Sequence, residues 1–188
     1  MPILGTVASQ FSGKSFGSFE SIATVSVSSA TQPITFSSIP QTFTHLQLRG
    51  IARSSRNAYI NNLHLMFNTS GPTYIDLNML IYNTTIYTGT NGNDFSGLKT
   101  DYFYMPTTQF SANIFGGYVF DIYDYTNTNK NKVIHAIGGA ADGGANTFGT
   151  FSSKTMKDTA AITSITLTQS ATTDFEQYSH WALYGIKA

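Results

Sequence analysis

The residues best suited to chemistry lie near the start of the chain, around a lysine and a serine flanked by glycines. Residues 8–15 read ASQFSGKS and satisfy a relaxed phosphate-loop pattern that ends at Lys14 and Ser15. In such a loop the backbone N–H groups hold the phosphates, but the mechanism requires a helix that begins at the lysine. The residues that follow Ser15 lead into a β pattern instead. We therefore reject a nucleotide site here.

The same segment also matches the nucleophile elbow of hydrolases. Residues 13–17 read GKSFG, which would expose Ser15 on a sharp turn between a strand and a helix. No helical pattern follows the serine, and no parallel sheet is indicated elsewhere. The sequence therefore assigns no catalytic residue, and we expect a protein that is not an enzyme.

The histidines and aspartates do not form a recognisable metal or acid–base group. Each histidine falls in a separate strand-like run, without paired ligand spacing: His45, His64, His135 and His180. Asp121 and Asp124 are three residues apart, which places them on opposite faces of a strand. The loop aspartates lack the spacing of a calcium loop. We expect no metal and no cofactor.

Three arginines occur close together near the end of one predicted strand: Arg49, Arg53 and Arg56. Guanidinium groups bind carboxylates and phosphates with two parallel hydrogen bonds, so the three side chains are suited to an acidic ligand or to carboxylates of a neighbouring subunit. Without interleaved aromatic residues they are weak support for nucleic-acid binding. We expect an interface or loop-anchoring role, and no nucleic-acid partner.

The composition is typical of a neutral domain that forms part of a larger assembly. Of the 188 residues only 11% are charged, the formal net charge is zero and there is no cysteine. A disulfide framework and a Cys-ligated zinc are thereby excluded. A neutral surface rich in Tyr and Phe tends to associate. No run of residues is apolar and long enough to predict membrane insertion.

Alternating apolar residues predict strands along most of the chain. Residues 19–28 and 33–37 are predicted to pair as a hairpin, and residues 113–127 and 132–140 as another. Residues 159–170 and 178–188 are predicted to pair at the end of the chain. Further strands are expected at residues 44–52, 63–68 and 74–83, and projecting loops at residues 83–100 and 138–148.

The predicted fold class is therefore all-β: an antiparallel β-sandwich, jelly-roll-like, with an extended N-terminal arm. Many short strands without helical periodicity favour this architecture as a single domain, residues 19–188. Within it, Trp181 and Leu183 are expected on the inward face of the last strand.

Residues 1–18 are predicted to be an attachment arm. This segment is rich in Gly and Ser, and its few apolar residues cannot outweigh the entropy lost on ordering it alone. The apolar residues that would insert into a neighbouring protein are Pro2, Ile3, Leu4 and Val7.

Several stretches resemble small β-rich structural proteins of tailed bacteriophage virions. They are FESIATVSV at residue 19, SIPQTFTHLQLRGIARSS at residue 38, FDIYDYTNTNKNKVIHAIGG at residue 120, the terminal TAAITSITLTQS and YSHWALYGIKA, and the opening PILGTVAS. The resemblance is weakest over residues 57–108. It implies a virion component that is exposed on the particle, and it singles out no catalytic or receptor-contacting residue.

The resemblance and the composition together lead to one main expectation and two alternatives. We expect a homotrimeric tail fibre or receptor-binding unit, located in the virion and docked through its arm on other virion proteins of the tail, neck or capsid. The first alternative is a capsid decoration (cement) protein. The second is a carbohydrate-binding module that recognises a host-surface glycan on aromatic platforms, for which the candidates are Tyr102, Tyr104, Tyr125 and Trp181.

Overall fold

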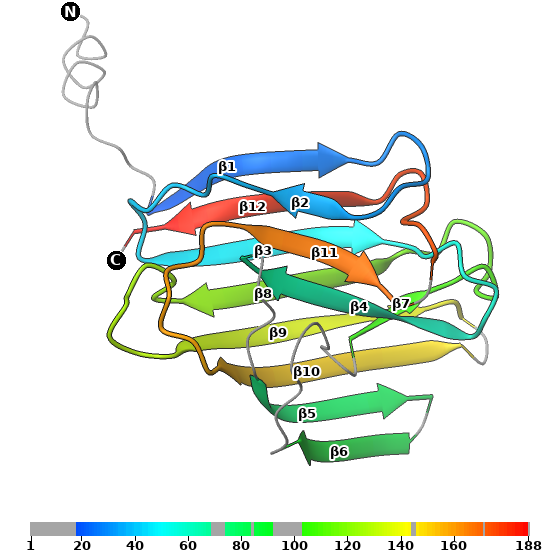
Figure 1. Cartoon of the computed structure of the whole chain (residues 1–188). Coiled ribbons are helices and arrows are strands. Elements are labelled where there is room, and N and C mark those ends of the chain that lie inside the picture. The colour runs from blue at the N-terminus through cyan, green and yellow to red at the C-terminus, as the bar shows by residue number, and fades with distance from the viewer. Residues whose placement is uncertain are drawn as a thin grey trace, which may run out of the picture.

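The chain folds into two antiparallel sheets that pack face to face (Figure 1). The computed structural model describes residues 18–68, 74–83, 85–91, 103–143, 146–170 and 172–187. Within these ranges the elements are strands, which confirms the predicted all-β sandwich. None of the described residues belongs to a helix long and apolar enough to cross a membrane.

The larger sheet has eight strands. In spatial order they are β1 (Phe19–Ser26), β12 (His180–Ile186), β3 (His45–Ala52), β8 (Gly116–Tyr123), β9 (Lys132–Ala141), β10 (Thr147–Met156), β5 (Tyr74–Tyr82) and β6 (Thr85–Asn91). All neighbouring strands are antiparallel. The predicted hairpin of residues 113–127 with residues 132–140 is confirmed as the pair β8 and β9.

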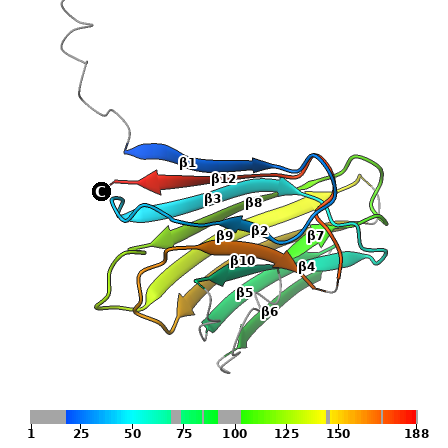
Figure 2. The same cartoon turned by 45° about the horizontal axis from the view of Figure 1, so that its top comes forward.

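The smaller sheet has four strands and covers one face of the larger one. Their spatial order is β2 (Ile34–Phe36), β11 (Ile165–Gln169), β4 (Ile60–Phe67) and β7 (Tyr104–Pro106). Figures 1 and 2 show these strands in front of the larger sheet, with β5 and β6 extending beyond them. The opposite face of the larger sheet is therefore left without a covering layer among the described residues.

The core fills the space between the two sheets. Leu46 and Leu48 of β3 and Leu63 and Leu65 of β4 belong to one core cluster, and all four side chains are buried. Trp181 and Leu183 are fully buried on the inward face of β12, as the sequence predicts. A second, smaller cluster lies under β5 and consists of Leu80, Phe110 and Phe148.

Two predicted strand pairs are wrong. Residues 159–170 provide β11 of the small sheet, whereas residues 178–188 provide β12 of the large sheet, so the two runs do not pair. The predicted hairpin of residues 19–28 with residues 33–37 is also wrong, because β1 and β2 lie in different sheets. The reason is that Leu167 and Leu183 both have to be buried, and crossing between the sheets brings their apolar faces into one core.

The predicted loops are also shorter than expected. Thr85–Asn91 is strand β6, because its β-forming residues complete hydrogen bonds along the edge of β5. The glycines at the end of β9 are part of the sheet: a Cβ on Gly138 would lie 2.4 Å from the ring of Tyr118. Glycine is thus required there for close packing rather than for a flexible tip, and β9 continues to Ala141.

Candidate functional site

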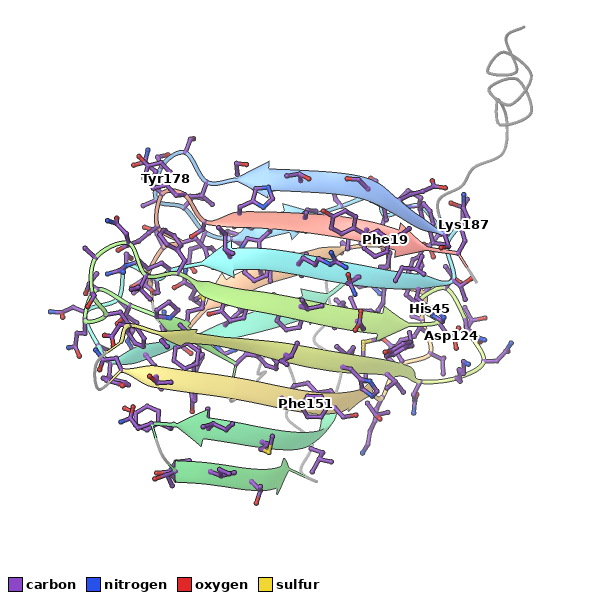
Figure 3. The ribbon with its side chains drawn as sticks, turned by 180° about the vertical axis from the view of Figure 1, so that it is seen from behind. Phe19, His45, Asp124, Phe151, Tyr178 and Lys187 are labelled. Atoms are coloured by element: carbon purple, nitrogen blue, oxygen red, sulfur yellow. The ribbon has the colours of Figure 1, made fainter. Side chains whose placement is uncertain are left out.

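The uncovered face of the larger sheet carries a group of exposed apolar side chains, which we call the outer apolar face. Its members are 38% to 62% exposed and are Ile51, Leu77, Met79, Ile81, Ile86, Ile137 and Phe151. Figure 3 looks directly at this face and shows Phe151 near the middle of β10. Large aliphatic and aromatic side chains gathered on one face mark an interaction surface.

The register of the strands places these side chains in adjoining rows. Phe151 lies opposite Ile137 of β9 on one side and opposite Met79 of β5 on the other. Residues directly opposite in a sheet project from the same face, so the three side chains form one continuous ridge. Ile81 and Ile86 are likewise opposite each other in β5 and β6 and extend the apolar surface to the edge.

A lane of glycines runs beside this ridge. Gly117, Gly139 and Gly149 are opposite one another in β8, β9 and β10, one row along from Ile137 and Phe151. A Cβ on Gly117 or Gly149 would meet no atom within 4 Å, so packing within the chain does not explain these two glycines. Glycine inside a strand weakens the strand and often marks a place where another molecule approaches closely.

A polar strip borders the apolar surface on β3 and β8. The Gln47 amide donates a 2.6 Å hydrogen bond to Asp121, and the Arg49 guanidinium donates to Gln47. Arg49 also lies over the rings of Phe19 and Tyr184, at 4.9 and 5.5 Å from their centroids. The outer face therefore has an apolar half and a half with polar and cationic side chains, as interfaces between proteins do.

The three arginines do not act as one group. Arg49 lies on the outer face, whereas Arg53 is buried beyond the end of β3, where it forms an ion pair with Glu176 at 3.0 Å and donates a hydrogen bond to the Ser111 carbonyl at 2.8 Å. Arg56 donates to the Asn61 side chain at 3.1 Å. Arg53 and Arg56 thus anchor loops, and Arg49 alone is available on the outer face.

The histidines are also dispersed. His45 accepts a hydrogen bond from the backbone N–H of Asp124, and His64 pairs with Ser170 in the small sheet. His135 packs edge-on against Tyr123 at 5.1 Å. Among the described residues, no group of three or more His, Cys, Asp or Glu is placed to hold a metal ion.

Lys132 is a buried charged residue that sequence reasoning did not identify. Its ammonium donates to the carbonyls of Asn127, Lys130 and Thr159, at 3.2 Å for Lys130 and 2.9 Å for Thr159. Burial lowers its pKa from the usual value, opposed by the charge of Asp158. These contacts close the loop between β8 and β9, so Lys132 holds loops together.

The predicted aromatic platforms are not available as such. Tyr125 and Trp181 are fully buried, and Tyr104 is half-buried with its ring edge-on to Phe148. Tyr102 lies outside the described residues, and so do the arm residues Pro2, Ile3, Leu4 and Val7. The same is true of the motif residues Lys14 and Ser15.

Comparisons with family models, with curated proteins and with solved structures found no match.

Proposed function

We propose that this chain is a structural subunit of a bacteriophage particle and that copies of it associate through the outer apolar face into a homotrimer. The observation that supports association is the apolar surface that β9, β10, β5 and β6 present on the uncovered side of the large sheet. Most side chains of the outer apolar face come from the adjacent strands β9, β10, β5 and β6, whereas Ile51 of β3 lies opposite Gly117 and is set apart from them. A lone subunit would expose this surface to water.

The size of the face suits a stable interface. Strands lie about 4.8 Å apart and rise about 3.3 Å per residue, so eight strands of about eight residues give a face of roughly 34 by 26 Å. That is about 900 Å², close to the roughly 800 Å² that each partner contributes to a standard interface. The apolar half would form its centre and the strip around Arg49 its polar rim.

The shape of the outer apolar face favours another copy of this chain as its binding partner. A ridge at Ile137 and Phe151 runs beside the lane of Gly117, Gly139 and Gly149. The ridge of one copy can enter the lane of the next, so each copy would offer two different parts of the face to two neighbours. The chain has no net charge, so no overall repulsion opposes association. Repetition of the same contact around a threefold axis closes a trimer.

The place in the particle is proposed from the sequence resemblance. Residues 1–18 would attach the subunit to another virion protein, and a tail fibre or receptor-binding unit is the first assignment. A capsid decoration protein is the alternative, since it would use the same kind of arm. Counting copies in purified particles separates the two, because a tail component is present in tens of copies and a lattice component in hundreds.

The association is tested by measuring the mass of the purified chain by sedimentation equilibrium at micromolar concentration. The wild type should have three times the chain mass. Phe151→Asp should yield monomers, because it places an unpaired carboxylate in an apolar interface. The matched control is Tyr87→Asp: Tyr87 is 52% exposed but lies opposite the inward-facing Leu80, so its variant should remain a trimer.

A monomeric wild type would overturn the proposal. A dimer that Phe151→Asp dissociates would retain the outer apolar face as the interface and overturn the threefold arrangement.

A further inference from the structure

The turn before β12 holds an exposed tyrosine ring in an unusual backbone conformation. Tyr178 is 72% exposed, the most exposed of the large apolar side chains, and its φ is 74°. Bulky residues seldom adopt this left-handed region. Such conformations persist only where the surroundings enforce them, and they are concentrated at ligand sites. Figure 3 places Tyr178 at the end of the molecule opposite Phe19 and Lys187.

The backbone around the ring is fixed on both sides. The Tyr178 N–H donates to the Val27 carbonyl at 2.9 Å, and the Val27 N–H donates to the Ser179 carbonyl at 2.8 Å. The Glu176 N–H donates to the Arg53 carbonyl at 2.9 Å. The turn is thereby tied to the segments after β1 and after β3, so the exposed ring stands on a rigid support.

Tyr178 lines two hollows. One has a volume of about 640 Å³, and its lining includes Ser28, Asn113, Phe115, Glu176 and Gln177. The other has a volume of about 420 Å³ and shares Ser28, Gln177 and Tyr178 with the first. Serine hydroxyls and the Gln177 amide line both hollows, and the Glu176 carboxylate lines the larger one.

An ion pair between the buried Arg53 and the partly exposed Glu176 lines the larger hollow. The Arg53 Nε lies 3.0 Å from the Glu176 carboxylate, and the other guanidinium nitrogens donate to the carbonyls of Ser111, Ile114 and Phe110. Arg53 thus fixes both the carboxylate and the loop that carries Asn113. The two charges compensate each other, so the hollow favours a neutral ligand rich in hydrogen-bonding groups.

We propose that this groove binds a saccharide, with Tyr178 stacking on the apolar face of a sugar ring. An exposed aromatic ring offers a flat apolar surface, and the serine hydroxyls, the amides of Asn113 and Gln177 and the Glu176 carboxylate match the hydroxyl groups of a sugar. The two hollows that share Tyr178 leave room for a ligand of at least two sugar units.

A peptide fits the groove less well. Extended peptides bind by adding a strand to an unpaired sheet edge. Here the N–H groups of Val27, Phe175, Glu176, Tyr178 and Ser179 already donate to carbonyls of the chain. Recognition must therefore come from side chains.

The groove also lies far from the point where the N-terminal segment joins the sandwich. The Lys187 N–H donates to the Ser18 carbonyl at 2.9 Å, which places that junction beside the C-terminal end of β12. Tyr178 precedes the other end of the same strand. A subunit attached through residues 1–18 would present the groove away from its attachment. The saccharide site itself requires neither attachment nor trimer formation.

The test uses the full chain on an array of immobilised oligosaccharides with glucose, galactose, mannose and N-acetylated termini, followed by titration of the best-retained member. Tyr178→Asn should weaken binding roughly tenfold or more, because it removes the ring while asparagine tolerates the left-handed backbone. Tyr178→Phe keeps the ring and should bind within about threefold of the wild type. Tyr87→Ala, which removes an exposed tyrosine elsewhere, should leave the affinity unchanged.

Two results would overturn the inference: no array member retained by the wild type, or wild-type affinity in Tyr178→Asn. The melting temperature and the sedimentation mass of Tyr178→Asn should equal those of the wild type. A loss of saccharide affinity without a change in sedimentation mass therefore tests the groove alone. A change in sedimentation mass tests the proposed trimer.

Discussion

Replacement of Trp181 by alanine would empty the centre of the core. Trp181 is the largest of the fully buried side chains. Its ring stacks on Tyr118 with centroids 5.6 Å apart and meets Phe175 edge-on at 6.3 Å. No backbone group changes, so the effect reports packing alone.

The expected loss follows from the buried area. A buried aromatic side chain removes about 150–250 Å² from water, worth about 4–6 kcal/mol at about 25 cal/mol per Å². Partial collapse of the cavity reduces this, so we expect Trp181→Ala to lower the free energy of unfolding by about 3–5 kcal/mol. The indole N–H has no hydrogen-bond partner among the described residues, so Trp181→Phe should cost less than about 2 kcal/mol.

Gly50 supplies a second variant for the same site. Gly50 of β3 lies opposite Trp181, and a Cβ built on it would be 2.2 Å from the indole ring. Gly50→Ala alone should therefore overpack the core and cost about 1–3 kcal/mol. In the Trp181→Ala background the methyl group enters the cavity, so the two losses should fall short of additivity by at least about 1 kcal/mol.

Urea unfolding followed by far-ultraviolet circular dichroism measures the wild type and the four variants. Fluorescence is unsuitable because Trp181 is the only tryptophan in the chain. A loss below about 1 kcal/mol for Trp181→Ala, or strict additivity with Gly50→Ala, would refute the packing described here.

Three further predictions concern the ends, the loops and the pH response. Deletion of residues 1–17 should leave the melting temperature of the sandwich nearly unchanged, since the Ser18 carbonyl still accepts the hydrogen bond from the Lys187 N–H. The same deletion should abolish incorporation into particles. An unfolded product would contradict the prediction that this segment is an attachment arm. Lys132→Met should lower the free energy of unfolding by about 1–3 kcal/mol, because the carbonyls around the ammonium lose their donor; equal urea midpoints would show that these contacts are dispensable. Burial, together with the neighbouring Tyr82, raises the pKa of Tyr59 to about 12. The folded state therefore holds the phenol proton more tightly than the unfolded state, and stability should fall between about pH 10 and pH 12 by up to about 1.4 kcal/mol per pH unit. Tyr59→Phe should flatten that decline, and an unchanged pH profile would exclude the assignment.

The strands were predictable because the inward residues alternate. Leu46 and Leu48, and likewise Trp181 and Leu183, occupy every second position and are all buried. Their partners were not predictable, because β11 and β12 each pair with strands distant in the sequence. The alternation in β5 was equally clear, yet its face of Leu77, Met79 and Ile81 is exposed. Periodicity identifies two faces of a strand and does not say which one meets the core.

The candidate surfaces were less accessible to sequence reasoning. Phe151 and Ile137 become neighbours only through the register of β9 with β10. The lane of glycines forms only when β8, β9 and β10 pair with one another. The exposure of Tyr178 depends on a left-handed backbone that its neighbours impose, and tyrosine itself signals no such turn. Arg53 was recognised as a candidate for loop anchoring, but its carbonyl partners come from a loop more than fifty residues away.

The central claim is that copies of the chain meet at the outer apolar face, and an intermolecular distance tests it most directly. Because the chain has no cysteine, Ile137→Cys places one nitroxide label at the centre of that face, and Tyr87→Cys places one on the opposite side of β6. Packed sheet faces lie about 10 Å apart, so pulsed electron resonance should give distances below about 25 Å between labels at position 137. Labels at position 87 should be farther apart. Absence of any intermolecular coupling at position 137, at a concentration of tens of micromolar, would contradict the account.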